Sequence, residues 1–187
     1  MLSFLNFLEE RVVSIGLNKD NEHLREKHRS EIHDLLHKAY SHPSIGGYGG
    51  LKSGSKEESD SIHHDISHSI IKATKRDGKI TAVNLYKNQH GRKMIAAGSD
   101  GSERGKEDWK KLSSDDHHQK RSWGEVSGAV EKIMTKIGAP KISAIHAKKI
   151  LNKDVKPVPN DPHRYVRKIG DHDHEKTIMG HPKIDLH

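Results

Sequence analysis

Residues 69–99 read SIIKATKRDGKITAVNLYKNQHGRKMIAAGS, and their pattern is the strongest indication of the fold class. An Asp-Gly pair at 77–78 is typical of a tight hairpin turn between two strands. Apolar residues alternate through 79–88, as they do in a strand with one buried face. A second turn at 88–91 leads to the apolar run in 92–99. The stretch therefore predicts an antiparallel meander of three strands.

The chain downstream of this meander alternates between helical and strand patterns. Apolar residues at i, i+3, i+4 and i+7 predict a helix over 128–137. Helical patterns are also present at 107–120, anchored by Trp109 and Leu112, and at 143–151, with a short strand at 121–127 and a hairpin at 165–179. The order β-β-β-loop-α-β-α-β-β predicts an α/β (α+β) fold with a mixed, mostly antiparallel sheet.

Composition limits the size of the core and the class of partner. The chain has 187 residues, 31% of them hydrophobic and 4% aromatic, which predicts one domain with a small aliphatic core plus an appendage. A net charge of +7 favours polyanionic partners, either nucleic acid or a phosphate-rich cofactor, although it also serves solubility alone. Because the basic residues are scattered and stacking aromatics are scarce, we expect any DNA binding to be weak, non-specific and salt-sensitive.

Several classes of site and location are excluded at this point. The chain has no cysteine, so it has no disulfides, thiolate zinc sites or cysteine nucleophiles. No apolar run approaches the roughly 18 residues of a membrane span. The N-terminus lacks the pattern of a secretory signal, so we expect a protein that is neither secreted nor membrane-bound.

The N-terminal region divides into two predicted helical parts. Residues 1–16, MLSFLNFLEERVVSIG, place apolar side chains at helical spacing and predict a helical peptide that ends at Gly16. Residues 17–42 predict a second helix that serves as a linker and ends before Pro43. Both parts are expected to stand outside the main domain, 43–187.

The segment Phe7-Leu8-Glu9-Glu10 resembles the capsid-targeting peptides of internal head proteins of T-even-type bacteriophages. Those peptides carry an aliphatic residue two positions before a Glu, after which a prohead protease cuts, and here the cut would follow Glu10. The resemblance implies a capsid internal protein with phage head proteins as partners, located in the virion interior or the host cytoplasm. The alternative is an ordinary amphipathic helix that packs on the core.

The element order over residues 68–180 resembles the GNAT N-acetyltransferase fold. The segments IGGYGGLKSGS, KITAVNLYK, AAGSDGS, WGEVSGAVEKIM and KTIMGHPK are also similar to small GNAT-like proteins of tailed-phage genomes. The resemblance implies an acyl-coenzyme A-dependent N-acetyltransferase. It also implies that acetyl-CoA is bound with its pyrophosphate at the loop and helix N-terminus that follow the third meander strand.

That loop carries the candidate cofactor-binding residues Gly101, Ser102, Arg104, Gly105 and Lys106. Backbone N–H groups at a helix N-terminus attract phosphate, and glycine lets the ligand approach closely. The spacing departs from the family's usual signature, which is Arg or Gln, two residues, Gly, one residue, then Gly or Ala. The alternative is a turn with a capping Ser.

Two residues are candidates for acid–base catalysis. Glu125, between Trp123 and Val126 in the short strand, would deprotonate the acceptor amine, and apolar surroundings would raise its pKa. Tyr165, which opens the terminal hairpin, would donate a proton. The alternative for each is a surface or structural role.

Two other features permit a ligand without requiring one. The Gly/Ser-rich segment 43–60 suits either a ligand-facing loop or a flexible linker. His64 and His68 have i, i+4 spacing, and residues 171–174 alternate Asp and His, yet both groups suit a polar surface as well as a divalent metal. We predict no metal site.

Three functional hypotheses remain. The first is a phage-encoded GNAT-like N-acetyltransferase, packaged in the head or made early in infection. The second is a non-enzymatic virion or DNA-associated protein that keeps the fold as a scaffold. The third, a metal-dependent hydrolase, ranks last.

Overall fold

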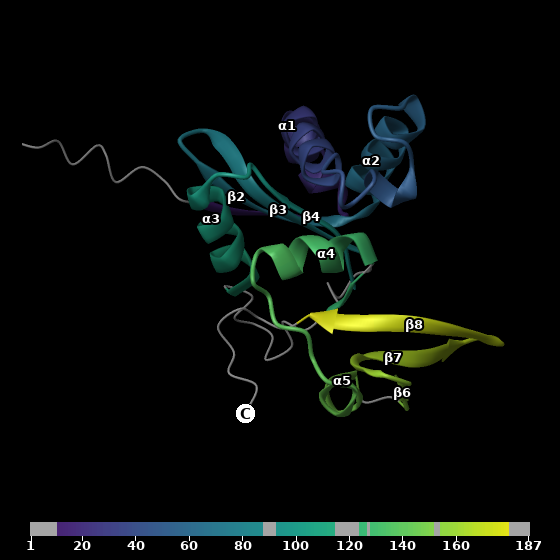
Figure 1. Cartoon of the computed structure of the whole chain (residues 1–187). Coiled ribbons are helices and arrows are strands. Elements are labelled where there is room, and N and C mark those ends of the chain that lie inside the picture. Colours follow the sequence, from purple (N-terminus) through teal and green to yellow (C-terminus); the bar gives the residue numbers. More distant parts are fainter. Residues whose placement is uncertain (1–10, 88–92, 115–123, 127, 152–153, 180–187) are drawn as a thin grey trace, which may run out of the picture.

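The computed structural model describes residues 11–87, 93–114, 124–126, 128–151 and 154–179, which form one mixed sheet flanked by helices (Figure 1). Its strand order is β1-β2-β3-β4-β5-β8-β7-β6. Among the described strands β4 and β5 pair in parallel, and the other neighbours pair antiparallel. The strands are β1 (Arg11–Ile15), β2 (Ile70–Arg76), β3 (Lys79–Lys87), β4 (Lys93–Ser99), β5 (Gly124–Val126), β6 (Lys156–Val158), β7 (Asp161–Ile169) and β8 (His172–Met179).

The predicted meander is confirmed as β2, β3 and β4. Asp77 and Gly78 form the first turn with φ angles of 50° and 83°, as the hairpin turn suggested by the Asp-Gly pair requires. Strand pairing begins beside this turn, where Arg76 lies opposite Lys79. The second predicted turn, 88–91, lies outside the described residues.

Helices cover both faces of the meander. Val83 and Asn84 are neighbours in β3, so their side chains point to opposite faces. Val83 pairs with Gly98, and Leu35 of α1 packs directly over this glycine. Trp109 of α3 donates a hydrogen bond to Asn84 on the other face. The helices are α1 (Glu22–Tyr40), α2 (Lys56–His68), α3 (Glu103–Ser114), α4 (Gly128–Lys136) and α5 (Ala144–Leu151), with short 3-10 turns η2 (Lys19–Asn21) and η3 (Tyr48–Gly50).

The predicted helix over 1–16 is wrong at residues 11–15, which form strand β1 at the edge of the sheet. Ile15 pairs with Ile71 of β2 and is fully buried. Three of the five residues in β1 are β-branched, and pairing with β2 satisfies their backbone groups better than an isolated helical turn would. Residues 1–10, including the segment that resembles a capsid-targeting peptide, lie outside the described residues.

The helix predicted within 17–42 is confirmed as α1, but it does not stand apart from the main domain. Ile32, Leu36 and Tyr40 are buried in the same core as Ile15 and Ile71. In this structure, β1 and α1 therefore belong to the sheet and core that the later residues complete.

Helix α2 occupies part of the segment that was expected to be a loop. Ser55 caps this helix, and its hydroxyl accepts a hydrogen bond from the Glu58 N–H. The sequence Ser55-Lys56-Glu57-Glu58 has the spacing of a capping box, so the start of α2 could have been detected. The short strand β6 was also missed.

The predicted fold class is confirmed: a mixed, mostly antiparallel sheet with helices on both faces. After the meander, α3 leads to β5, α4 follows, and the hairpin of β7 and β8 places β8 beside β5. A second, smaller core lies around α5 and this hairpin. None of the helices in the described ranges is long and apolar enough to cross a bilayer.

Candidate functional site

A cavity of about 450 Å³ lies among helices α1, α2, α4 and strand β4. Its volume is in the range of pockets that bind small organic ligands. Aliphatic and aromatic side chains and glycine backbone form most of its wall. The lining residues are Tyr40, Ile45, Gly47, Tyr48, Gly49, Gly50, Ser61, Asp65, Ile95, Gly128, Ala129 and Lys132.

The cavity lies where the sheet opens between β4 and β5. These two strands pair at Lys93 with Glu125 and at Met94 with Val126, and their register ends there. Ile95 follows directly, and a register shift between β3 and β4 falls at the same position. Such a register shift is a β-bulge, which bends the strand and changes the direction of the side chain at that point. Ile95 consequently lines the cavity at the point where the strands separate.

The glycine-rich segment that follows α1 forms one wall of this cavity. Gly47 has a φ of +106°, and a Cβ there would lie 1.9 Å from the Leu51 carbonyl oxygen, so only glycine fits. The buried Glu58 carboxylate accepts hydrogen bonds from the N–H groups of Tyr48 (2.8 Å) and Gly54 (2.7 Å). His37 of α1 lies 3.0 Å from the same carboxylate. The segment is thus held on α2 and faces a cavity.

The pKa of Glu58 reflects these contacts. Burial alone would raise the pKa of this carboxyl group. The N–H groups of Tyr48 and Gly54, together with His37, outweigh burial and hold the pKa below its ordinary value. Glu58 is therefore ionised at neutral pH, and its charge keeps the cavity wall in place.

Two tyrosines and one carboxylate lie in the wall of the cavity. The Tyr40 hydroxyl accepts a hydrogen bond from the Ala97 N–H of β4 at 3.4 Å. The Tyr40 ring packs edge-on against Tyr48, with 4.8 Å between centroids. The Tyr48 hydroxyl donates to Asp65 Oδ2 at 2.7 Å. Sequence reasoning did not select these residues, because they come from three separate elements.

Burial raises the pKa of both tyrosines. Desolvation is the main cause for Tyr40 and for Tyr48, and the negative charge of Asp65 raises the pKa of each further. Both hydroxyls therefore keep their protons at neutral pH. The Tyr48 hydroxyl uses its proton in the bond to Asp65, and the Tyr40 hydroxyl keeps its proton for a hydrogen bond inside the cavity.

The predicted phosphate-binding loop is closed by its own side chains. The Asp100 carboxylate accepts hydrogen bonds from the Ser102 N–H (2.9 Å) and the Ser102 hydroxyl (2.6 Å). Ser102 Oγ in turn accepts from the Gly105 N–H at 2.9 Å, as a helix cap does. This is the capping arrangement that the sequence left as the alternative.

The two glycines of this loop have distinct structural roles. Gly101 has a φ of +86°, which lets the chain turn into α3. A Cβ on Gly105 would lie 2.0 Å from Asp100 Oδ1, so the missing side chain makes room for that carboxylate. Lys106 pairs with Glu103 at 2.6 Å, and Arg104 is exposed. None of the five predicted cofactor residues lines the cavity.

The two predicted catalytic residues lie on the second half of the sheet. Glu125 is in β5, paired with Lys93 and Ile178, and its side chain lies outside the described part of the structure. Tyr165 of β7 is fully buried in the smaller core with Ile142 and Ile178. Tyr165 does not line the cavity, so its position favours the structural alternative.

The histidines stack instead of converging on one point. The rings of His64 and His68 lie 4.3 Å apart, and those of His33 and His63 lie 4.4 Å apart. Within the described ranges, no group of three or more His, Asp or Glu side chains is placed to hold a metal ion. His64 and His68 are both exposed, so this stacked pair lies on the polar surface of α2.

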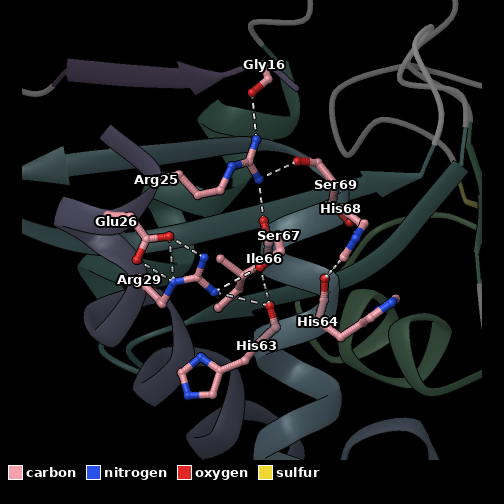
Figure 2. Close-up of polar contacts among 10 residues, drawn as sticks. All are labelled: Gly16, Arg25, Glu26, Arg29, His63, His64, Ile66, Ser67, His68 and Ser69. Atoms are coloured by element: carbon pink, nitrogen blue, oxygen red, sulfur yellow. Dashed lines mark hydrogen bonds and ion pairs between the residues drawn. The ribbon is translucent and has the colours of Figure 1, made fainter. Parts of the chain in front are cut away.

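Two arginines of α1 fasten α2 beside the cavity (Figure 2). The buried Arg25 guanidinium donates to the carbonyls of Ile66, Ser69 (2.9 Å) and Gly16 (2.6 Å). Arg29, one turn later, pairs with Glu26 and donates to α2 at Ser67 Oγ (3.1 Å). Arg25 therefore joins β1, α1 and the end of α2.

Comparison with known proteins gives limited information. No family model and no curated protein sequence matches the chain. Among solved structures, the chain is similar to the aminoglycoside 6'-N-acetyltransferase from Enterococcus faecium, with 10% sequence identity and a TM-score of 0.41. The match covers 89% of this chain and 94% of that chain. At this level the likeness carries no functional information.

Proposed function

We propose that this chain is a GNAT-like N-acetyltransferase that uses acyl-coenzyme A, and that the cavity beside Ile95 is its acceptor site. The observation that carries the proposal is the opening of the sheet between β4 and β5 at a cavity that holds a carboxylate and two buried tyrosine hydroxyls. In GNAT-like proteins, the strand after the pyrophosphate-binding helix faces the acceptor. The catalytic candidates of this proposal are therefore Asp65, Tyr40 and Tyr48, with Glu125 retained on that strand, whereas Tyr165 is buried outside the cavity.

These residues suit the acceptor half of an acyl transfer. The Asp65 carboxylate would hold an incoming ammonium group and take the proton that the nitrogen must lose before it attacks. Tyr48 fixes the position of Asp65 through its hydrogen bond. Tyr40 keeps its hydroxyl proton because its pKa is raised, and it lies next to the opening between β4 and β5. A bound acyl-coenzyme A would supply the activated acyl group.

The predicted phosphate-binding end of the cofactor site, as observed in this structure, does not fit the pyrophosphate of coenzyme A. The Asp100 carboxylate caps the N-terminus of α3, where a pyrophosphate would lie. Two anions cannot share that position, so coenzyme A could bind there only after Asp100 moves. This cap is the observation that favours the alternative function, a non-enzymatic virion or internal head protein that keeps the fold as a scaffold.

Asp100→Asn separates the two functions. Asparagine keeps an oxygen acceptor for Ser102 and removes the negative charge, so an acetyltransferase should bind coenzyme A about tenfold more tightly than wild type. Calorimetric titration with coenzyme A measures this. Asp77→Asn removes the same charge from the neighbouring β2–β3 turn, outside the α3 cap, and should change the affinity much less.

Two results would decide against the enzyme. If neither wild type nor Asp100→Asn binds coenzyme A at millimolar concentration, the scaffold function is favoured. An equal gain in Asp77→Asn would mean that the effect is general charge and not the α3 cap. Substitutions at Gly105 are less informative, because any side chain there would displace Asp100 with or without a ligand.

We also propose that the chain is phage-encoded and packaged in the head. The support is the sequence Phe7-Leu8-Glu9-Glu10, and cleavage after Glu10 would leave β1 complete from Arg11. Protein from purified virions should therefore begin at Arg11 by intact-mass measurement, while recombinant protein made without phage protease should retain residues 1–10. Virion protein that still carries residues 1–10 would contradict the proposal.

A further inference from the structure

The cavity carries one charged side chain of each sign. Asp65 comes from α2 and Lys132 from α4, and the other ten lining residues are glycine, alanine, isoleucine, tyrosine and serine. Ile45, Ile95 and the tyrosine rings supply apolar wall. A ligand that fills the cavity therefore meets an anion, a cation and aliphatic surface.

Asp65 keeps its negative charge available to a ligand. Its Oδ2 accepts the Tyr48 hydroxyl at 2.7 Å, a neutral donor that orients the carboxylate without cancelling its charge. Its Oδ1 lies 3.5 Å from His64 Nδ1, and the His64 side chain is 66% exposed. Water screens that exposed neighbour, so the carboxylate stays attractive to an ammonium group.

Among the residues that the structure describes, no carboxylate neutralises the Lys132 charge either. Its Nζ donates to the Ser44 carbonyl at 3.2 Å, which orients the ammonium group but leaves its charge. The acid on the same helix, Glu131, pairs with Lys141 at 2.9 Å instead. Within the described residues, no ion pair involves Lys132.

We infer that the cavity selects an acceptor with one ammonium group and one carboxylate, joined by an aliphatic chain. The ammonium group binds Asp65, the carboxylate binds Lys132, and the methylene groups contact Ile45 and Ile95. A second positive charge on the ligand would meet Lys132, so polyamines are rejected. That this ligand is an acetyl acceptor rests on the proposed function. That it binds in the cavity does not depend on the proposed function.

The test uses three amines that differ in charge at the far end. 6-Aminohexanoate, hexylamine and spermidine are titrated by calorimetry into the full chain, without coenzyme A. 6-Aminohexanoate should bind about tenfold more tightly than hexylamine, because it alone satisfies both charges. Spermidine should bind more weakly than hexylamine.

Matched variants assign each charge to its residue. In Asp65→Asn the side-chain oxygen can still accept the hydrogen bond from the Tyr48 hydroxyl. This variant should bind 6-aminohexanoate and hexylamine more weakly, and by the same factor. Lys132→Gln should reduce the affinity for 6-aminohexanoate to that for hexylamine, and it should leave the affinity for hexylamine unchanged. Lys136→Gln removes the same charge from α4, but Lys136 contacts His42 and does not line the cavity. This variant should therefore change the affinity for neither amine.

The outcomes separate this inference from the proposed function. Spermidine that binds as tightly as 6-aminohexanoate, or a tenfold preference that survives in Lys132→Gln, overturns the inference. If acetyl-CoA then acetylates spermidine, the acetyltransferase stands and only its substrate class is wrong. If 6-aminohexanoate binds with the expected variant pattern but no acetyl group is transferred, the binding site stands and the enzyme proposal fails.

Discussion

Replacing Arg25 with methionine is expected to lower the free energy of unfolding by about 3–5 kcal/mol, because it leaves three backbone carbonyls without their hydrogen-bond donor. Arg25 is 6% exposed, and its guanidinium serves the carbonyls of Gly16, Ile66 and Ser69. Two of these carbonyls lie at or just beyond the C-terminal end of α2, where helical partners are missing. Methionine fills much of the volume but donates no hydrogen bond, so the carbonyls would remain buried and unpaired.

Arg29→Met is the matched control, one helical turn away. The Arg29 side chain is 23% exposed and its main partner, Glu26, is 57% exposed. Water can therefore replace much of the hydrogen bonding that Glu26 loses in the variant. Urea denaturation should show a loss of about 1 kcal/mol or less for this variant. Equal losses in the two variants would contradict the role assigned to Arg25.

The second large effect is expected at Asp108, which fastens α3 to the sheet. Its carboxylate is fully buried and accepts two hydrogen bonds from Arg76 (3.1 and 2.5 Å) and one from Thr81 (2.7 Å). Asp108→Ala would leave the Arg76 guanidinium without this partner, and we expect a loss of about 3–4 kcal/mol in urea denaturation. Glu107→Ala removes an exposed carboxylate from the adjacent position and should change stability by less than about 0.5 kcal/mol.

The Asp108 effect should depend on pH in a defined direction. Burial would raise the pKa of this carboxyl group, but hydrogen bonds from Arg76 and Thr81 and the charge of Arg76 hold it below the ordinary value of 3.8. A lowered folded-state pKa contributes stability above the ordinary value, and that stability is lost as the pH falls through the lowered one. The difference between wild type and Asp108→Ala should therefore be largest at neutral pH and shrink below about pH 4. A difference that stays constant down to pH 2 would contradict this account.

The candidate site was only partly visible in the sequence. The glycine pairs of IGGYGG indicated a ligand-facing loop, and the structure places Gly47, Gly49 and Gly50 in the cavity wall. Tyr40, Asp65 and Lys132 had no such signal, because each comes from a different helix and no motif joins them. The loop of Gly101 and Gly105 had the residues of a phosphate cradle, yet Asp100 occupies it. A sequence pattern cannot show whether an anion from the chain itself fills such a cradle.

Features that depend on short-range contacts could be predicted from the amino-acid sequence. The Asp77-Gly78 turn requires only two adjacent residues that tolerate positive φ, so the meander could be predicted. The apolar spacing of α1 and α4 likewise needs no distant partner. The strand at residues 11–15 could not be predicted in this way, because its hydrogen-bond partners in β2 lie some 60 positions later in the chain. The cavity also depends on contacts between distant segments, since β4 and β5 must separate beside α1 and α2 before Asp65 and Lys132 can line one space.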